Sequence, residues 1–458
     1  MRHDPIAPAR FNQTQAIAVL LKISNITFNV TLKNAASSRL GYFVRLEELS
    51  EPVRQRLKRL PPPYQAHFGI VPPPPPDEAV SILAVAQKYR AAEAVIIKID
   101  TLAAELPDPY LISRILTRRE AVSSSAIEGT QSTLDELLAI DEGVAESATA
   151  ASRQVRSYAL ALEDWIGKAQ DRGRSIFNAD LISTLHRSIM QDDPNYKDKP
   201  GALRSRVVWI GRSAGNIAHS TYNPTPPEDI PACLNQHLGY LRDEGGRAIA
   251  QGLIMRMAIA HAHFEAVHPF QEGNGRVGRL LLPLMMAAES HAPLYISPHI
   301  EANRQAYYDA LKVAQQRLEW TAIIGFMADA VLQSVQALLA TRDALSRLKT
   351  IWESRRQFRA SSAAARALSI LPHHPIVTVN RLVKLLAVSF PAAAQAVEQL
   401  SKVGILIERT GYKRNRVFAA DEALLIINRP FGDEPILPSK GPEDLNSTTR
   451  AARPKFPP

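Results

Sequence analysis

The most informative part of this sequence is the stretch His268-Pro-Phe-Gln-Glu-Gly-Asn-Gly-Arg-Val-Gly-Arg279. It brings an imidazole, a carboxylate, a glycine-rich turn and two arginines together within twelve residues. His268 can accept a proton near neutral pH, where imidazole titrates. Glu272 offers the hard oxygen ligand that Mg²⁺ takes when it also binds phosphates. Few reactions need this combination, and attack by a hydroxyl group on a magnesium-bound nucleotide phosphate is one of them.

The middle of the stretch has the features of an anion-binding turn. Gly273, Asn274 and Gly275 allow the backbone to turn tightly and to point its N–H groups inward. The apolar residues that follow predict a helix over 276–288. The turn would then lie at a helix N-terminus, where free N–H groups and the helix dipole attract anions. Arg276 and Arg279 are three residues apart on that helix and can reach the same phosphate chain.

Other interpretations of these residues are weaker. Gly273-x-Gly275-x-x-Gly278 matches the dinucleotide-binding fingerprint, but that fingerprint needs a preceding β-strand, and residues 251–267 have the apolar spacing of a helix. The only Gly-Lys pair, Gly167-Lys168, is followed by alanine and is not a phosphate-binding P-loop. A zinc site is disfavoured, because His261 and His263 would point to different sides of a helix and the chain has one cysteine.

At every fixed position the stretch resembles the signature of the Fic family of AMP transferases, His-x-Phe-x-Asp/Glu-Gly-Asn-Gly-Arg-x-x-Arg. The resemblance implies a mainly α fold, with a Fic-type helical core and a β-hairpin flap. It also implies that His268 is the catalytic base, that Glu272 holds Mg²⁺, and that ATP is bound by Gly273, Asn274, Gly275, Arg276 and Arg279. Relatives that phosphorylate their targets carry lysine at the position of Gly275, so glycine favours AMP transfer.

A second segment, Ser124-Ser-Ala-Ile-Glu128-Gly129, resembles the inhibitory motif of this family, Ser/Thr-x-x-x-Glu-Gly/Asn. It lies N-terminal to the signature, as in the class whose inhibitory helix is an N-terminal part of the same chain. By this resemblance Glu128 pairs with Arg279 and withdraws that arginine from the γ-phosphate of ATP. The alternative is that Glu128 is an ordinary surface residue, since Glu is a good helix former.

Two further segments resemble the family less sharply. Residues 199–211 resemble the entry to the flap, which we expect at residues 216–227. In the family the flap holds the extended main chain of the target by strand addition, although a plain surface loop is the alternative. Tyr307 and Tyr308 resemble contacts to the adenine side of the nucleotide, but a tyrosine on a helix is often simply half-buried. Gln315 stands near the place where some relatives have an asparagine.

Composition indicates a globular protein of two or three domains. The chain has 458 residues, and 46% of them are hydrophobic, which is enough for a sizeable core. Its one cysteine, Cys233, cannot form an intramolecular disulfide, which suits a reducing cytosol. No apolar run approaches the length of a transmembrane helix, so we expect a cytoplasmic protein with no membrane partner.

Positive charge is concentrated towards the C-terminus. Residues 347–420 contain thirteen Lys and Arg against three acidic residues, a net charge of +10, whereas the whole chain carries +9. This concentration favours a polyanionic partner. The same region predicts a helix over 376–387, a second helix over 392–402 and a hairpin over 405–418, which is the order of a winged helix-turn-helix.

This region resembles the winged helix domain attached to many bacterial Fic proteins. Lys413, Arg414 and Arg416 would then lie on the wing, where they can meet DNA phosphates. The second helix would be the recognition helix, but its alanine-rich start offers few groups that read bases. Winged helices also serve as protein-contact or dimerisation modules, so DNA binding and a homodimer are both left open.

The sequence therefore predicts five regions. They are an unassigned extension (1–40), a Fic N-terminal region with the inhibitory helix (41–150), a catalytic core (151–345), a small C-terminal winged helix domain (346–425) and a disordered tail (426–458). The expected function is an autoinhibited protein adenylyltransferase that moves AMP from ATP to a Tyr, Thr or Ser hydroxyl of a target protein. The alternatives are a nucleotide-sensing, DNA-binding transcription regulator and a hydrolase that removes AMP with the same site.

Overall fold

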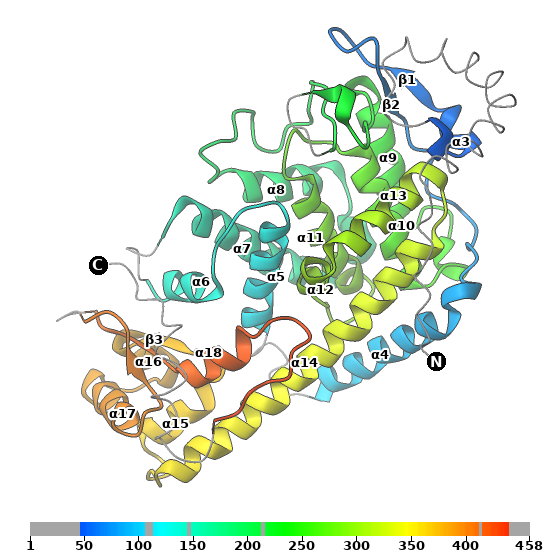
Figure 1. Cartoon of the computed structure of the whole chain (residues 1–458). Helices are drawn as coiled ribbons and strands as arrows, with labels where there is room; N and C mark the ends of the chain where they lie inside the picture. The colour runs from blue at the N-terminus through cyan, green and yellow to red at the C-terminus, as the bar shows by residue number, and fades with distance from the viewer. Residues whose placement is uncertain (1–45, 106–112, 144–147, 212–215, 412–414, 439–458) are drawn as a thin grey trace, which may run out of the picture.

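The computed structural model of the chain describes residues 46–105, 113–143, 148–211, 216–411 and 415–438. Helices dominate these residues, which confirms the predicted mainly α fold (Figure 1). The α-helices are α3 (Glu51–Arg54), α4 (Ala86–Glu105), α5 (Ser113–Ile127), α6 (Leu134–Asp141), α7 (Ala150–Arg172), α8 (Ala179–Met190), α9 (Ile230–Leu241), α10 (Leu253–Val267), α11 (Asn274–Ala288), α12 (Ser297–Ala302), α13 (Arg304–Arg317), α14 (Thr321–Arg355), α15 (Ala363–Ile370), α16 (Val379–Leu386), α17 (Phe390–Lys402) and α18 (Asp421–Ile427).

Two small antiparallel sheets accompany these helices. The first pairs β1 (Leu57–Arg59) with β2 (Phe68–Ile70). The second lies in the C-terminal part and has the strand order β3-β5-β4, formed by β3 (Ile376–Thr378), β5 (Val417–Ala419) and β4 (Ile407–Glu408). The strands are short, with two or three residues each, and the residues of the predicted signature lie on helices and their connecting loop.

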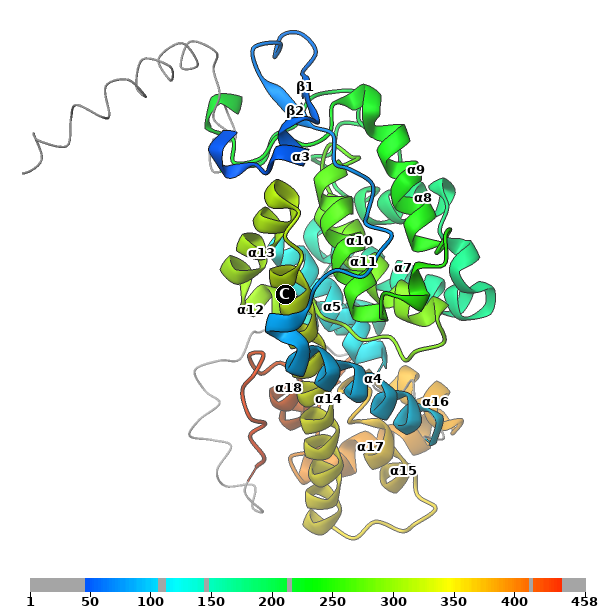
Figure 2. The same ribbon diagram turned by 90° about the vertical axis from the view of Figure 1, so that its right-hand side faces the viewer.

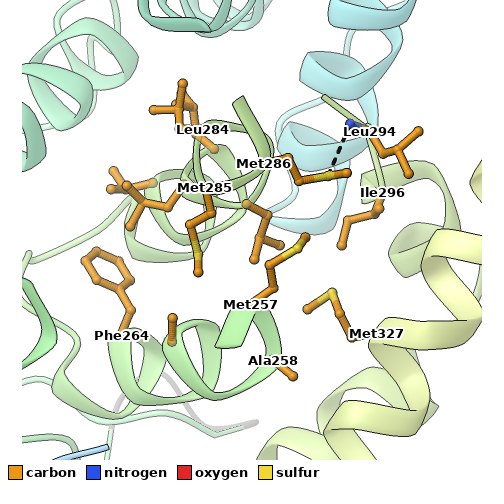
Figure 3. Close-up of a cluster of buried hydrophobic side chains, with 14 of the residues drawn as sticks. Met257, Ala258, Phe264, Leu284, Met285, Met286, Leu294, Ile296 and Met327 are labelled. Atoms are coloured by element: carbon orange, nitrogen blue, oxygen red, sulfur yellow. Dashed lines mark hydrogen bonds between the residues drawn. The ribbon is translucent and has the colours of Figure 1, made fainter. Parts of the chain in front are cut away.

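The core is built around α10 and α11. Every residue of α10 is buried, because its sequence is apolar or small on nearly all sides. It packs against α11, α13 and α14, and α11 packs in turn against α7 and α8. In Figure 3, Met257 of α10, Met285 and Met286 of α11, and Met327 of α14 meet in this core. Flexible methionine side chains fill irregular gaps between helices well, which suits a junction of three helices.

The predicted signature loop connects these two central helices. α10 ends at Val267 and α11 begins at Asn274, so the loop is held at both ends by buried helices. His268 and Gly273 both adopt the left-handed conformation, with φ values of 51° and 81°. These two residues reverse the chain direction within six residues, which a non-glycine residue such as His268 does only under constraint from its neighbours.

The long helix α14 links the core to the C-terminal part of the protein (Figures 1 and 2). Of the helices in the described residues, it is the one that is long and apolar enough to cross a membrane by length and composition. This differs from the sequence analysis, which expects no apolar run of transmembrane length. Its apolar residues contribute to both large hydrophobic cores, and 56% of its most apolar window is buried within the fold.

The C-terminal part has its own hydrophobic core, which includes residues of α14 to α18 and also of α5 and α6. The helix predicted over 376–387 begins later, because Ile376, Val377 and Thr378 form strand β3 beside β5. β-Branched residues suit a strand, and the Thr378 side chain then caps α16 by accepting a hydrogen bond from the Arg381 amide at 3.1 Å.

The disordered tail predicted from residue 426 starts inside a helix, since α18 continues to Ile427. Beyond it, Arg429 is buried and donates hydrogen bonds to Thr341 Oγ1 at 2.8 Å and to the Ala337 carbonyl at 3.2 Å. Composition alone did not reveal these partners on α14. Residues 439–458 lie outside the described part of the chain, as does the predicted N-terminal extension, residues 1–40.

The predicted flap differs from a regular β-hairpin. Within its described residues it has one isolated antiparallel bridge, between Ile210 and Tyr222, and a short 3-10 helix, Ile217–His219. The stretch also contacts β2, because the Ile70 amide donates to the Asn223 carbonyl at 3.0 Å. Prolines at 224, 226 and 227 lack the N–H groups that a longer ladder needs.

Candidate active site

The predicted inhibitory segment lies at the C-terminal end of α5, directly against α11. Arg279 donates from Nη2 to Glu128 Oε1 at 2.7 Å, and it also bonds the Ser124 hydroxyl and the Ser124 carbonyl, each at 2.9 Å. Gly129 follows with a φ of 88°, the left-handed conformation that glycine commonly adopts after a helix C-terminus. The structure thus brings Ser124, Glu128 and Arg279 together across more than 150 residues of sequence.

The charge pair is strongly coupled. Burial raises the pKa of the Glu128 carboxyl, but the Arg279 guanidinium more than offsets this effect and lowers the pKa overall. Burial likewise lowers the pKa of Arg279, and Glu128 reverses that change. Both groups are therefore charged at neutral pH. The Glu128 carboxylate also fills the space over Gly275, where a Cβ atom would collide with it.

Arg276 is different from Arg279, because most of its guanidinium is unpaired. It is 4% exposed, its Nη2 contacts Met190 Sδ at 3.0 Å, and its Nε and Nη1 have no hydrogen-bond partner among the described residues. Burial lowers the pKa of this guanidinium, and the nearby carboxylates of Glu128 and Glu272 act in the opposite direction. A buried cation with unused donors is costly unless an anion pairs with it, so Arg276 is suited to bind a phosphate.

Asn274 closes the loop through its side chain. Its Oδ1 accepts from the Phe270 amide, and its Nδ2 donates to the Phe270 carbonyl, both at 2.8 Å. Both polar ends are therefore used within the protein, so any contact of this residue to a nucleotide comes from its backbone. The first backbone bond at the start of α11 runs from the Val277 amide to the Gly273 carbonyl, so the preceding amides lie at the open helix N-terminus.

His268 lies at the edge of this cluster. Its side chain is 18% exposed, and its Nδ1 is buried 3.9 Å from Glu265 Oε2. Burial lowers the pKa of His268 to about 4, and the charge of Arg204 adds to this effect. Burial also raises the pKa of Glu265 to about 8. At neutral pH the imidazole is therefore neutral and can accept a proton, as a general base must.

Two residues that the sequence analysis did not select hold the loop in place. His186 on α8 accepts from the Gly201 amide at 2.8 Å and, through its other ring nitrogen, donates to the Glu272 carbonyl at 3.0 Å. Its ring stacks on Phe270, with 3.8 Å between centroids. Arg204 donates to the His268 carbonyl at 2.8 Å. The sequence analysis does not single out His186, and it includes Arg204 only within the flap entry, residues 199–211.

The two tyrosines differ in accessibility. Tyr307 is 2% exposed, and its hydroxyl lies 2.6 Å from His261 Nε2, so it is enclosed and already hydrogen-bonded. This position does not suit the nucleotide contact expected of it. Tyr308 is 47% exposed and lies 5.2 Å from the Tyr307 ring, which leaves it free to contact a ligand. Gln315 donates to the Ala262 carbonyl at 3.4 Å.

Glu272 is exposed on the surface of the loop. It contributes to the electrostatic environment of Arg276, so its carboxylate lies near the unpaired guanidinium. One accessible carboxylate next to a phosphate site fits Mg²⁺, which commonly binds one or two carboxylates together with phosphate oxygens and water. No cluster of three or more His, Cys, Asp or Glu side chains in the described ranges has the arrangement of an all-protein metal site.

The expected wing residues give less support to DNA binding. Arg416 forms an ion pair with Glu408 and lies over the Phe418 ring, and Lys413 and Arg414 lie outside the described residues. Of the thirteen basic residues counted from the sequence, seven are in ion pairs, namely Arg347, Lys349, Arg355, Arg381, Lys402, Arg409 and Arg416. Pairing within the protein reduces the positive field that a polyanion would meet.

Comparison with known proteins agrees with this arrangement. Residues 176–286 match the Fic/DOC family, and residues 86–165 match the Fic/DOC family N-terminal region. The first match contains the whole loop from His268 to Arg279, and the second contains Ser124 and Glu128. The chain is therefore similar to the Fic/DOC family over these two stretches, which contain the residues of the candidate site.

Several relatives are protein adenylyltransferases. Protein adenylyltransferase fic-1 of Caenorhabditis elegans is 34% identical over 136 residues, which cover 30% of this chain and 23% of that protein. A probable protein adenylyltransferase of Aquifex aeolicus is 24% identical over 201 residues, covering 44% of this chain and 56% of the relative. The aligned part thus spans about a quarter of the first relative and about half of the second. A crystal structure of a Fic family protein from Desulfovibrio desulfuricans G20 superposes with a TM-score of 0.46 at 19% identity, covering 76% of this chain and 98% of that one.

Proposed function

We propose that this protein transfers AMP from ATP to a hydroxyl group of a target protein. The observation that carries the proposal is Arg276, a buried guanidinium with unused donors at the open N-terminus of α11, close to a neutral histidine. A phosphate chain would satisfy those donors, and the helix N-terminus would add its own attraction for anions. The similarity to protein adenylyltransferases supports the same activity.

His268 acts as the general base in the proposed reaction. Its Nδ1 is enclosed, so its Nε2 takes the proton from the attacking Tyr, Thr or Ser hydroxyl. The oxygen forms a bond to the α-phosphorus, the bond from that phosphorus to the β-phosphate oxygen breaks, and pyrophosphate leaves. The α11 amides, Arg276 and Arg279 hold the phosphates, and they contribute mainly by positioning and charge stabilisation. Mg²⁺ held by Glu272 would supply further charge neutralisation on the phosphates.

Glu128 inhibits this reaction in the proposal. While its carboxylate holds Arg279 and covers Gly275, Arg279 cannot pair with the γ-phosphate. A nucleotide can still be bound by Arg276, but its α-phosphate is poorly aligned for attack. Activation then requires that Glu128 moves away from Arg279.

The C-terminal residues 363–419 have the order of a winged helix, with α15, β3, α16, α17 and the β4–β5 pair. We propose that this module serves mainly protein contacts, because four of the six basic side chains described within it are in ion pairs and because it already contacts α5. Arg114 of α5 donates to His374 Nδ1 at 3.0 Å. DNA binding, a homodimer and a cytoplasmic location stay expectations from the sequence.

Incubation with ATP labelled at the α-phosphate tests the proposed function. The Glu128→Gly variant should label itself or a protein in lysate, and His268→Ala in the same background should abolish the label. ATP labelled at the γ-phosphate should give no label, which separates AMP transfer from phosphorylation. The matched control is His291→Ala, a histidine that pairs with Asp100 at 2.7 Å outside the loop and should leave labelling unchanged. Equal labelling with and without His268 would refute the assignment of the base.

A further inference from the structure

Arg204 occupies an unusual position beside the catalytic loop. It is 6% exposed, and each part of its guanidinium donates to a backbone carbonyl: Nε to His268 at 2.8 Å, Nη1 to Arg206 at 3.0 Å and Nη2 to Thr225 at 2.5 Å. Its own amide donates to the Pro269 carbonyl at 3.0 Å. Arg204 therefore connects the loop that carries the proposed base to Arg206, in the flap entry, and to Thr225, near the end of the flap.

These bonds hold His268 in a backbone conformation that it would not adopt freely. His268 has a φ of 51°, its amide donates to the Phe264 carbonyl at 2.9 Å, and its carbonyl accepts from Arg204. Both sides of the residue are thus hydrogen-bonded, which fixes the direction of the imidazole. A non-glycine residue in the left-handed region needs such support from the surrounding structure.

The charge of Arg204 has no carboxylate partner among the described residues. Its hydrogen-bond acceptors are all neutral carbonyls, and burial lowers its pKa to about 10, so it stays charged at neutral pH. Among the described residues, the charged or titratable groups that act on His268 are Glu265 on α10, Glu128 directly after α5 and Arg204 on the flap entry. The positive charge of Arg204 opposes protonation of the imidazole, whereas the charge of Glu128 favours it.

We propose that Arg204 is a positioning residue that couples the flap segment to the loop that carries His268 and places a fixed positive charge beside the imidazole. The proposal rests on the proposed function, in which His268 is the base. It assigns two separate effects to one side chain. The forked hydrogen bonds set the geometry between flap and loop, and the charge sets the pH range in which the base works.

Two substitutions separate these effects in the full-length Glu128→Gly protein. Arg204→Lys keeps the charge but cannot span three carbonyls, so the transfer rate should fall about tenfold at saturating ATP while the acid limb of the pH–rate profile stays in place. Arg204→Gln removes the charge as well. The transfer rate should fall by the same factor, and the acid limb of the pH–rate profile should also shift to higher pH. The KM for ATP should stay unchanged in both, because Arg204 contacts no group of the phosphate site.

A matched control is Arg429, a buried guanidinium that bonds carbonyls of α14 and α18 far from the loop in sequence. Arg429→Gln should lower the melting temperature as Arg204→Gln does, but it should leave the acid limb in place. An equal shift of the limb in both variants would overturn the proposal. So would Arg204→Lys and Arg204→Gln variants that keep the parent rate and profile.

A direct titration of His268 separates this inference from the proposed function. With histidine labelled at Cε1, the NMR signal that is missing from His268→Ala reports the pKa of this residue whether or not the protein is active. The pKa should be higher in Arg204→Gln than in the parent and unchanged in Arg204→Lys. If the Glu128→Gly parent transfers no AMP, the proposed function fails, and the titration still decides whether Arg204 controls the histidine. If Arg204→Gln does not fold, the transfer rate of Arg204→Lys still tests the positioning role of Arg204.

Discussion

Replacing Glu128 with glycine should release Arg279 and raise AMP transfer. The carboxylate makes one charge-assisted hydrogen bond to Arg279 at 2.7 Å, and such bonds contribute about 1.5–3 kcal/mol. The Glu128 side chain is 34% exposed, so solvent screens part of that energy and we take the lower part of the range, about 1.5–2 kcal/mol. If this pair must break before ATP binds productively, the transfer rate rises by about 10- to 30-fold.

Initial rates of self-labelling with α-labelled ATP, at equal protein concentration, measure this effect. Glu128→Gln keeps the length of the side chain but loses its charge, so it should give a smaller increase than Glu128→Gly. Glu48→Gly is the matched control, because Glu48 pairs with Lys312 at the same 2.7 Å, is 29% exposed and belongs to a different ion pair. Rates within twofold of the wild type in Glu128→Gly, or an equal increase in Glu48→Gly, would refute the reasoning.

Three other results are expected. Burial lowers the pKa of His186, His263 and His268 to about 4 and of His261 to about 3, so the unfolded state binds more protons below pH 6.5. The free energy of unfolding should therefore fall by up to about 5 kcal/mol per pH unit from pH 6.5 towards pH 4, and Glu265, with a pKa of about 8, opposes this with only one proton. Urea unfolding with equal free energies at pH 7 and 5 would contradict the prediction. His186→Phe keeps the stacked ring but leaves the Gly201 amide and the Glu272 carbonyl unpaired, so the free energy of unfolding should fall by about 2–5 kcal/mol. A change below about 0.5 kcal/mol, on the order of a neutral surface substitution, would argue against these bonds. If the C-terminal module serves protein contacts, fluorescence anisotropy with duplex DNA should show weak binding that the Arg416→Ala variant leaves unchanged, and tight binding with a steep salt dependence would instead favour the DNA-binding alternative.

Local patterns predicted most of the helices near the site. The apolar spacing over residues 251–267 and 276–288 corresponds to α10 and α11, and the structure begins α11 two residues earlier, at Asn274. Gly129, which follows Glu128 in the motif, has the positive φ that glycine commonly adopts after a helix C-terminus. These features depend on contacts between residues a few positions apart, which a sequence displays directly.

The flap and the C-terminal tail were harder to predict for a physical reason. The flap segment is rich in proline, so its described residues form one isolated bridge within the hairpin, and Asn223 is hydrogen-bonded to the distant strand β2 through its carbonyl and its side-chain amide. Arg429 lies in a stretch whose composition predicts disorder, yet it donates hydrogen bonds to residues of α14 that are about ninety positions away. No local periodicity carries information about partners so far apart.

The sequence by itself determined the chemistry of the loop, because the residue types from His268 to Arg279 and their spacing on one turn and one helix are local properties. Only the tertiary structure decided which of those groups are free. It pairs Arg279 with Glu128 and leaves Arg276 unpaired, encloses Tyr307 behind His261, and sets Arg204 and His186 against the loop. The reason is that burial and choice of partner depend on how helices far apart in the sequence pack together, and the low-dielectric interior then makes each pairing, or its absence, energetically important.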